Sequence, residues 1–163
     1  MKLIRLAFIS VVLLFALAAF VGALLPSTVL VSRAININVP RDTIKPYLTS
    51  ITAWKEWIDG MNNTSVKISA PLKADLAGTA VDITEITDST IVSSWTGSSG
   101  SKQLSTMRVI GDSLQKVTVV QWQFEQKLKW YPWEKLGSMM NDKILGTMME
   151  KNLNNLKQLL EKK

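Results

Sequence analysis

The sequence predicts an α+β fold in which one long C-terminal helix lies across a curved antiparallel β-sheet, preceded by one transmembrane helix. Three observations predict it. An apolar run extends from Leu6 to Leu25, short β-type segments follow one another between residues 29 and 126, and an amphipathic segment extends from Trp133 to Glu161. Strands and helices that are segregated along the chain in this way are typical of α+β proteins.

The N-terminal apolar run is interrupted only by Ser10 and Gly22. A helix of this length, at about 1.5 Å per residue, spans roughly 30 Å, which is the hydrocarbon thickness of a bilayer. We therefore expect residues 1–26 to form a transmembrane anchor. The remaining residues, 27–163, have the usual size of a single domain.

A cleaved secretory signal peptide is the alternative for this run. Lys2 and Arg5 fit the basic start of such a signal, and residues 16–18 offer the small side chains that a signal peptidase recognises. Cleavage after Ala18 would leave residues 19–25 as an apolar stub, which favours the anchor. Basic residues flank the run on both sides. We expect the domain to face away from the cytoplasm, and a cytoplasmic orientation stays open.

Composition excludes several kinds of chemistry. The chain contains neither cysteine nor histidine, so disulfides, zinc–thiolate sites and Ser-His-Asp or Cys-His machinery are absent. We expect no metal and no cofactor, and an enzyme would depend on carboxylates, lysine, tyrosine or bound water. Without Lys2 and Arg5, 17 of the 19 basic residues remain against 13 acidic ones, a net charge of about +4. This charge is spread along the chain with no basic stripe between aromatics, so we expect no nucleic-acid partner.

The domain begins with strict alternation of apolar and polar residues from Val29 to Val39, which predicts a half-buried strand that Pro40 ends. A short helix is expected next, capped by Asp42 or Thr43, with Pro46 near its first turn. Its apolar residues are Ile44, Tyr47, Leu48 and Ile51. A second helical turn is expected over residues 54–58, where Trp54 and Trp57 share one face.

An antiparallel meander is expected to follow, because short β-type runs alternate with turn residues. The runs are 65–70, 79–87, 90–96, 103–110 and 115–126, and the turns are 74–78, 88–89, 97–101 and 111–113. From Trp133 to Glu161, apolar residues recur every three or four positions, which predicts a long amphipathic helix. At about 1.5 Å per residue it reaches roughly 40 Å, enough to cross a five- or six-stranded sheet.

Four segments resemble the SRPBCC superfamily, also called START/Bet v 1-like, and in particular its bacterial polyketide cyclase/dehydrase-type branch. These segments are Val31-Ser32-Arg33-Ala34-Ile35-Asn36-Ile37-Asn38-Val39-Pro40, Trp54-Lys55-Glu56-Trp57, Val119-Val120-Gln121-Trp122 and Met149-Glu150-Lys151-Asn152-Leu153-Asn154-Asn155-Leu156-Lys157. The resemblance implies a helix-grip fold, in which the sheet wraps around the terminal helix and leaves a deep apolar cavity. Such cavities hold lipids, sterols, polyketides or other hydrophobic molecules. No catalytic residue can be carried over.

Candidate cavity residues come from both layers. The ligand-cavity candidates are Arg33, Glu85, Trp122, Met140, Ile144 and Met148. Methionines on the helix suit an adaptable pocket, and ordinary core packing is the alternative. Arg33 and Glu85 are in phase with inward apolar residues, so they could pair with each other or bind a polar ligand head. A bulge or strand end that turns each of them to solvent is the favoured alternative.

Two further features concern the long helix. Gly146 weakens it by about 1 kcal/mol relative to alanine, so this glycine is expected to permit close approach of backbone or ligand. Trp130, Tyr131 and Trp133 flank Pro132 at its start. They are candidates for the cavity mouth, where they could stack on a ligand, lie at a membrane interface or act as a hydrophobic latch.

The leading functional hypothesis is a membrane-anchored, non-enzymatic domain that binds or carries a hydrophobic small molecule, with lipid as the expected class. One alternative is a cyclase or dehydrase that moves protons with a carboxylate or a tyrosine, against which the absence of histidine argues. Another is a protein-interaction domain with a filled cavity. The oligomeric state and the identity of the ligand are left open by the sequence.

Overall fold

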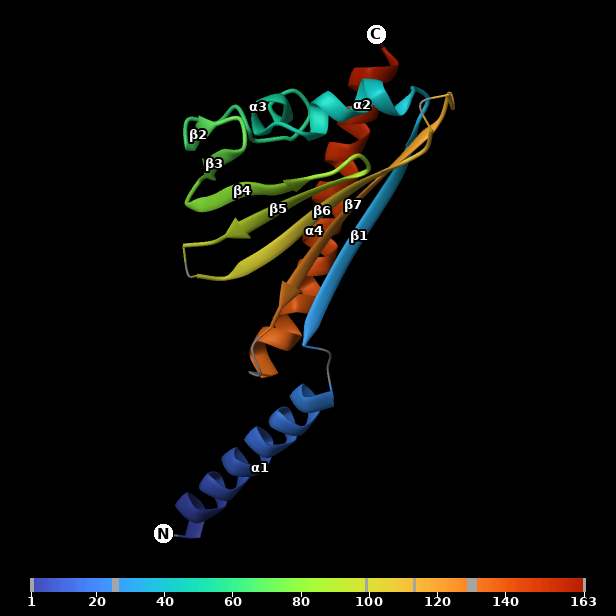
Figure 1. The fold of residues 1–163 in the computed structure, drawn as a ribbon. Helices are drawn as coiled ribbons and strands as arrows, with labels where there is room; N and C mark the ends of the chain where they lie inside the picture. The colour runs from blue at the N-terminus through green and yellow to red at the C-terminus, as the bar shows by residue number, and fades with distance from the viewer. Residues whose placement is uncertain (1, 25–26, 99, 113, 129–131, 163) are drawn as a thin grey trace.

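Seven antiparallel strands form one sheet in the order β1-β7-β6-β5-β4-β3-β2 (Figure 1). The strands are β1 Thr28–Ile37, β2 Val66–Ala70, β3 Lys73–Leu76, β4 Thr79–Ile86, β5 Thr90–Thr96, β6 Lys102–Ile110 and β7 Thr118–Lys127. The helices are α1 Lys2–Leu24, α2 Arg41–Leu48, α3 Ile51–Trp54 and α4 Pro132–Glu161. The computed structural model describes residues 2–24, 27–98, 100–112, 114–128 and 132–162, with only the backbone of residues 2 and 132–141.

The inner face of the sheet is set by the alternation in β7. Thr118, Val120, Trp122 and Phe124 are buried, whereas the residues between them are half-buried. The register of β1 on β7 pairs Val31 with Phe124 and Ile35 with Val120, so the alternating residues of β1 share this face. Buried α4 residues complete the core: Met149, Leu153, Leu156 and Leu160. The predicted α+β class and the long terminal helix are thereby confirmed.

The sheet has one strand more than the sequence predicted. Residues 74–78 were expected to be a turn, but β3 pairs with both β2 and β4. Its residues Lys, Ala and Asp have low β-propensity, so tertiary pairing and the burial of Ala74 override local preference here. The real turn lies at Ala77 and Gly78, which have φ values of 54° and 89°. The Gly78 amide donates to Asp75 Oδ1 over 2.7 Å and stabilises it.

The two short helices also differ from their predicted limits. α2 begins directly after Pro40 without a side-chain cap, so Asp42 and Thr43 lie within its first turn and Pro46 lies inside the helix rather than near its start. Ile51 opens α3 instead of ending α2. The Ser50 hydroxyl accepts a hydrogen bond from the Thr52 amide over 3.2 Å and caps α3, which ends at Trp54.

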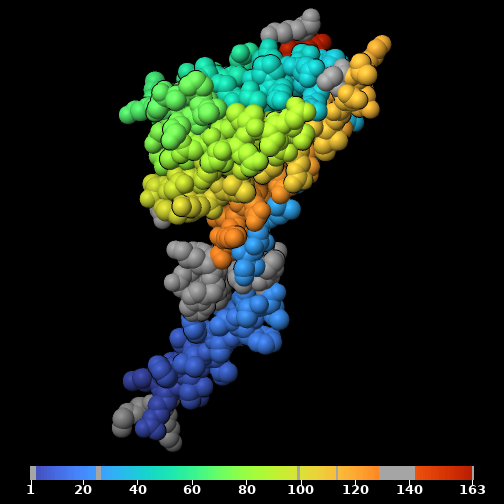
Figure 2. All heavy atoms as spheres, viewed as in Figure 1, coloured from blue at the N-terminus to red at the C-terminus, as the bar shows by residue number. Residues whose placement is uncertain are grey.

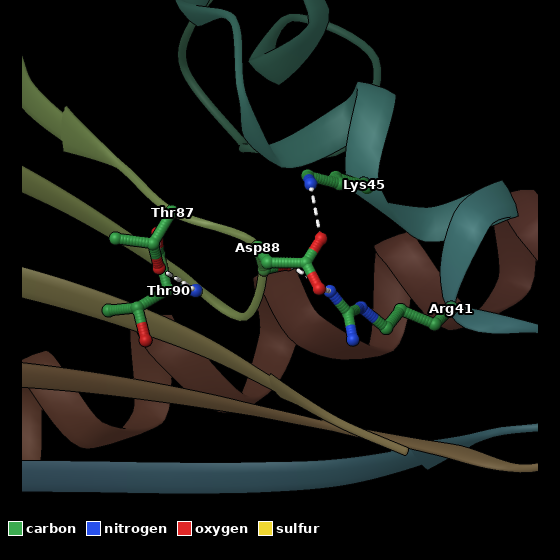
Figure 3. Close-up of polar contacts among 5 residues, drawn as sticks. All are labelled: Arg41, Lys45, Thr87, Asp88 and Thr90. Carbon is green, nitrogen blue, oxygen red and sulfur yellow. Dashed lines mark hydrogen bonds and ion pairs between the residues drawn. The ribbon is translucent and has the colours of Figure 1, made fainter. Parts of the chain in front are cut away.

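An ion cluster fixes α2 to the turn between β4 and β5 (Figure 3). Arg41 and Lys45 both reach Asp88, and the Lys45 Nζ to Asp88 Oδ1 distance is 3.0 Å. The turn itself is closed by the Thr90 amide, which donates to Thr87 Oγ1 over 3.0 Å. Hydrogen bonds from Arg41 and then Lys45 lower the pKa of the Asp88 carboxyl below its ordinary value.

Five aromatic rings fill the core between the sheet and the helices; we call Trp54, Trp57, Trp95, Trp122 and Phe124 the aromatic cluster. Trp54 stacks on Trp95 with a centroid distance of 6.3 Å, and Trp57 meets Trp122 edge to face at 5.6 Å. The Trp54 and Trp57 indoles donate to the Leu48 and Tyr47 carbonyls, both over 3.0 Å. The two tryptophans predicted to share a face therefore hold α2 and α3 against the sheet.

α1 stands apart from this core (Figures 1 and 2). Its segment Leu3–Leu24 is long and apolar enough to cross a membrane, a property it shares with signal sequences. The start of β1 and the start of α4 lie beside its C-terminal end, whereas α2, α3 and the C-terminus of the chain lie at the opposite end of the domain (Figure 1). In the following, the two ends are called the anchor end and the distal end.

Candidate ligand groove

An open groove of about 300 Å³ lies between α4 and the sheet, near the anchor end. Its described lining residues are Gln103, Gln126, Ile144, Leu145 and Met148. The helix supplies an apolar wall and the sheet supplies two amides. Gln103 Nε2 donates to Gln126 Oε1 over 3.1 Å. This pairing leaves the Gln126 amide N–H groups and the Gln103 carbonyl oxygen as potential partners for a ligand.

The groove forms where the hydrophobic face of the sheet ends. Gln126 lies opposite Gln103 on β6 and opposite Val29 on β1. Gln126 and Gln103 are the next inward-facing residues along their strands after Phe124 and Ser105, which are buried. Two neighbouring strands therefore place a polar residue on the inner face at the same level, and both side chains line the groove.

The helix wall presents large apolar side chains that the domain itself does not cover. Ile144 is 68% exposed and Met148 is 36% exposed, although both lie on the side of α4 that faces the groove. Behind Met148, Asn152 is fully buried. Its Nδ2 donates to Met148 Sδ over 3.2 Å, and its Oδ1 accepts from the Asp59 amide over 2.9 Å. This side chain ties the floor of the groove to the loop after α3.

Arg33 lies on the other flank of α4. Its Nε is 2.6 Å from Glu150 Oε1, and its Nη1 donates to the Ser32 carbonyl over 2.9 Å. A Cβ atom added at Gly146 would lie 2.1 Å from Arg33 Nη2, so the absence of a side chain there is what admits the guanidinium. Gly146 and Glu150 are roughly 200° around the helix from Ile144 and Met148. Arg33 thus points inward but contacts neither the groove nor Glu85.

The other predicted site residues fall in three places. A bulge between Ile83 and Glu85 shifts the alternation of inward and outward side chains in β4, and the Glu85 side chain is exposed. Trp122 is fully buried in the aromatic cluster, and its indole donates to Ser105 Oγ over 2.9 Å. Ile144 and Met148 line the groove. Trp130 and Tyr131, and the side chains of Trp133 and Met140, lie outside the described residues.

The groove-lining side chains in the described part of the chain carry no charge, which matters for the chemistry available there. The carboxyls with a lowered pKa lie elsewhere, in surface ion pairs. Asp88 pairs with α2, and a hydrogen bond from Lys151 lowers the pKa of Asp59. Within the described ranges, no three His, Cys, Asp or Glu side chains gather as metal ligands. The site visible here is suited to binding by apolar contact and neutral hydrogen bonds.

Sequence reasoning missed Gln103 and Gln126. A signal for them existed, because Gln126 is in phase with the inward residues Trp122 and Phe124, and Gln103 is in phase with Met107. Two amides in core phase on strands that pair indicate a polar patch inside the sheet. Recognising it requires the register of β6 on β7, which the sequence does not specify.

A sheet that wraps around a C-terminal helix and opens beside it defines the helix-grip class of α+β domains. Comparison with solved structures agrees. The chain is similar to a START superfamily protein from Mycobacterium smegmatis, with 14% identity, a TM-score of 0.63, and coverage of 82% of this chain and 97% of that one. It is also similar to CalU16 from Micromonospora echinospora, with 14% identity, a TM-score of 0.56 and 81% coverage of each chain.

A third similarity is to BexL, a di-domain ARO/CYC protein of the BE-7585A biosynthetic pathway, with 12% identity and a TM-score of 0.61. The match covers 83% of this chain and 50% of that one. No known family model matches the sequence, and no curated protein matches it. At these identities the comparisons establish the fold: the chain has the helix-grip fold of START and polyketide cyclase-like proteins, as its sequence segments indicated.

Proposed function

We propose that this protein is a membrane-anchored domain that binds a hydrophobic, lipid-like small molecule in the groove beside α4. The observation that supports this most is the juxtaposition of Ile144 and Met148, exposed on the helix, with an amide pair on the facing strands. An apolar wall with a few polar groups that fix orientation is the usual form of a small-molecule site.

The composition of the groove favours a ligand with an uncharged polar end. Gln103 and Gln126 can donate to and accept from a hydroxyl, ester or amide, whereas a carboxylate or phosphate brought to this position would lose water without meeting an opposite charge. Arg33 is a basic residue on the inner face of β1, but it pairs with Glu150 on the flank of α4 that faces away from the groove. Burial of ligand hydrocarbon against Ile144, Leu145 and Met148 would supply the favourable free energy.

The membrane anchor is part of the same proposal. α1 has the length of a membrane-crossing helix, and most of its side chains are exposed because the domain does not cover them. We propose that it stays attached and that the domain faces away from the cytoplasm, with one pass through the membrane.

A cyclase or dehydrase is the second candidate function, favoured by the structural likeness to BexL. It would require an acid or base that reaches the groove, and the described lining residues include none. The two functions are separable by turnover: a binding domain returns its ligand chemically unchanged.

Two fluorescent probes of matched shape test the proposal. The full chain is reconstituted in phosphatidylcholine nanodiscs, and quenching of tryptophan emission is followed as retinol or retinoic acid is added. Trp95 lies opposite the groove residue Gln103 and should report occupancy. We expect saturable quenching by neutral retinol that exceeds quenching by retinoate at least several-fold.

Gln103→Leu and Gln126→Leu should each reduce the preference for retinol over a hydrocarbon of the same length. The matched control is Gln121→Leu, which alters a glutamine on the outer face of β7, the strand that carries Gln126. Equal, non-saturable quenching by both probes in every variant would contradict binding in the groove. Saturable binding followed by chemical conversion would instead favour the enzyme.

A further inference from the structure

The connection between α1 and the sheet is short. α1 ends at Leu24 and β1 begins at Thr28, so residues 25–27 join them. A fully extended chain covers about 3.4 Å per residue, which limits the distance from Leu24 to Val29 to about 17 Å. The Leu128 amide donates to the Ser27 carbonyl over 2.8 Å, so β1 and β7 stay paired up to this connection.

Along the strand direction, the groove lies at the same level as Val29, which closely follows this connection. Val29 is opposite Gln126, and Gln126 is opposite Gln103, so the amide pair is one and two strands away from Val29. Neighbouring strands are only about 4.8 Å apart. The distal end, with α2 and the Asp88 cluster, is separated from this level by most of the length of the sheet (Figure 1).

The outer surface at the same end has the composition of an interfacial contact. Lys102 and Lys127 are exposed at the first residue of β6 and the last residue of β7. At the next outward-facing level of the sheet, Leu30 and Leu104 are 55% and 42% exposed, and they lie opposite Glu125 on its two sides. Lysines beside exposed leucines suit the boundary between lipid headgroups and acyl chains, where the amines reach phosphates and the leucines lose contact with water.

The size of the groove fits the same arrangement. At about 300 Å³ it is at the lower end of small-molecule sites, and it is open rather than enclosed. A long-chain ligand would therefore extend beyond Ile144, whose side chain is 68% exposed. An apolar chain that protrudes at the anchor end finds a favourable environment only if the bilayer is adjacent.

We propose that the anchor end of the domain docks on the bilayer that holds α1, so that the groove exchanges its ligand directly with that membrane. The proposal rests on the proposed function, since it needs α1 in the membrane and a ligand in the groove. Two parts of the chain contact the membrane. α1 limits how far the domain can move from the bilayer, and the surface formed by Lys102, Lys127, Leu30 and Leu104 determines which end of the domain faces the lipids.

The distal end offers a competing apolar surface. Ile110 is 54% exposed and Leu114, in the connection from β6 to β7, is 92% exposed. If the domain tilted so that this hairpin met the bilayer, the groove would face water. Lys102 is the first residue of β6 and Leu114 lies beyond its other end, so labels at these two positions distinguish the two orientations.

The absence of cysteine allows single labels without background. Nitroxides are attached to Lys102→Cys, Leu114→Cys and Leu14→Cys in the full chain, reconstituted in vesicles of phosphatidylcholine and phosphatidylglycerol. The accessibility of each label to oxygen, which concentrates in lipid, and to a water-soluble nickel chelate is then measured. We expect the oxygen-to-nickel ratio at 102 to exceed that at 114 several-fold, with the highest ratio at 14.

Lengthening the connection provides the second measurement. Insertion of twenty glycine and serine residues after Pro26 should lower the ratio at 102 towards that of a water-exposed label and slow loading of retinol from the vesicle several-fold. Retention of a preloaded ligand should be unchanged, because the groove is intact.

The outcomes separate the two proposals. A water-like label at 14 would overturn the anchor itself. Lipid-like accessibility at 14 with water-like accessibility at 102, or a higher ratio at 114 than at 102, would overturn the docking alone. Loading that is insensitive to the insertion would overturn direct exchange with the anchoring membrane.

Discussion

The two halves of α4 meet the same sheet in different ways. From Met149 to Leu160, its inward side chains are buried in the core, whereas Ile144 and Met148, five residues and one residue before Met149, remain exposed beside an amide pair. The change occurs where the inner face of β6 and β7 passes from the buried residues Ser105 and Phe124 to Gln103 and Gln126. The distal half of the inner face therefore stabilises the fold, and the half nearer α1 is the one for which we propose a binding role.

The largest expected effect is in the aromatic cluster. Trp122→Ala removes a fully buried ring that contacts Trp57 and Phe124, and we expect it to lower the free energy of unfolding by about 3–5 kcal/mol. Ile144→Ala truncates an exposed side chain of the groove and should change the free energy of unfolding by less than about 0.5 kcal/mol. Urea unfolding of both variants, followed by far-UV circular dichroism, measures the difference. Similar losses would show that the halves are one structural unit.

Asn152 lies at the boundary between the halves. Asn152→Ala leaves the Asp59 amide without its acceptor, and an unsatisfied buried donor costs about 1–3 kcal/mol. Asn154 is exposed two residues later on the same helix, so Asn154→Ala is the matched control and should be nearly neutral. Hydrogen exchange at the Asp59 amide should accelerate only in Asn152→Ala. Unchanged protection there would mean that this bond does not hold the loop.

A smaller effect is expected on the Arg33 flank. Gly146→Ala alone should gain little, because its new Cβ displaces the Arg33 guanidinium from Glu150 and offsets the helix-propensity gain of about 1 kcal/mol. In an Arg33→Ala background the same substitution should realise that gain. A double-mutant cycle on unfolding free energies measures the coupling, for which we expect about 1 kcal/mol. Additive effects would contradict the close approach of Arg33 to Gly146.

The smallest effect belongs to the distal ion cluster (Figure 3). Hydrogen bonds from Arg41 and Lys45 lower the pKa of Asp88 in the folded chain. These contacts therefore stabilise the fold above the unfolded carboxyl pKa of about 3.9, and the contribution is lost as the pH falls through the lower folded value. Asp88→Asn should be less stable than the parent at neutral pH and converge with it in acid. A gap that widens as the pH falls would reverse the assigned direction.

The sequence predicted those elements in which apolar residues recur at one regular spacing, every second residue in a strand or every third to fourth residue in a helix. The alternation from Val29 to Val39 and the repeat of apolar residues from Trp133 to Glu161 are regular along the sequence, so β1 and α4 were found nearly at their limits. β3 was missed because its partners on both sides, not its own residues, make it a strand. The amide pair was missed for a related reason: Gln103 and Gln126 are far apart in the chain and become a site only through strand register.

The contrast between a packed half and a binding half is tested most directly by identifying what the full chain carries. The protein is purified into nanodiscs of one synthetic phosphatidylcholine, and native mass spectrometry with lipid extraction detects any other bound molecule. We predict one uncharged hydrophobic molecule per chain, lost in Met148→Trp, which fills the groove, and retained in Ile110→Trp, which adds the same ring to an exposed site beyond it. A chain that carries no such molecule, or one that Met148→Trp leaves bound, would contradict the account.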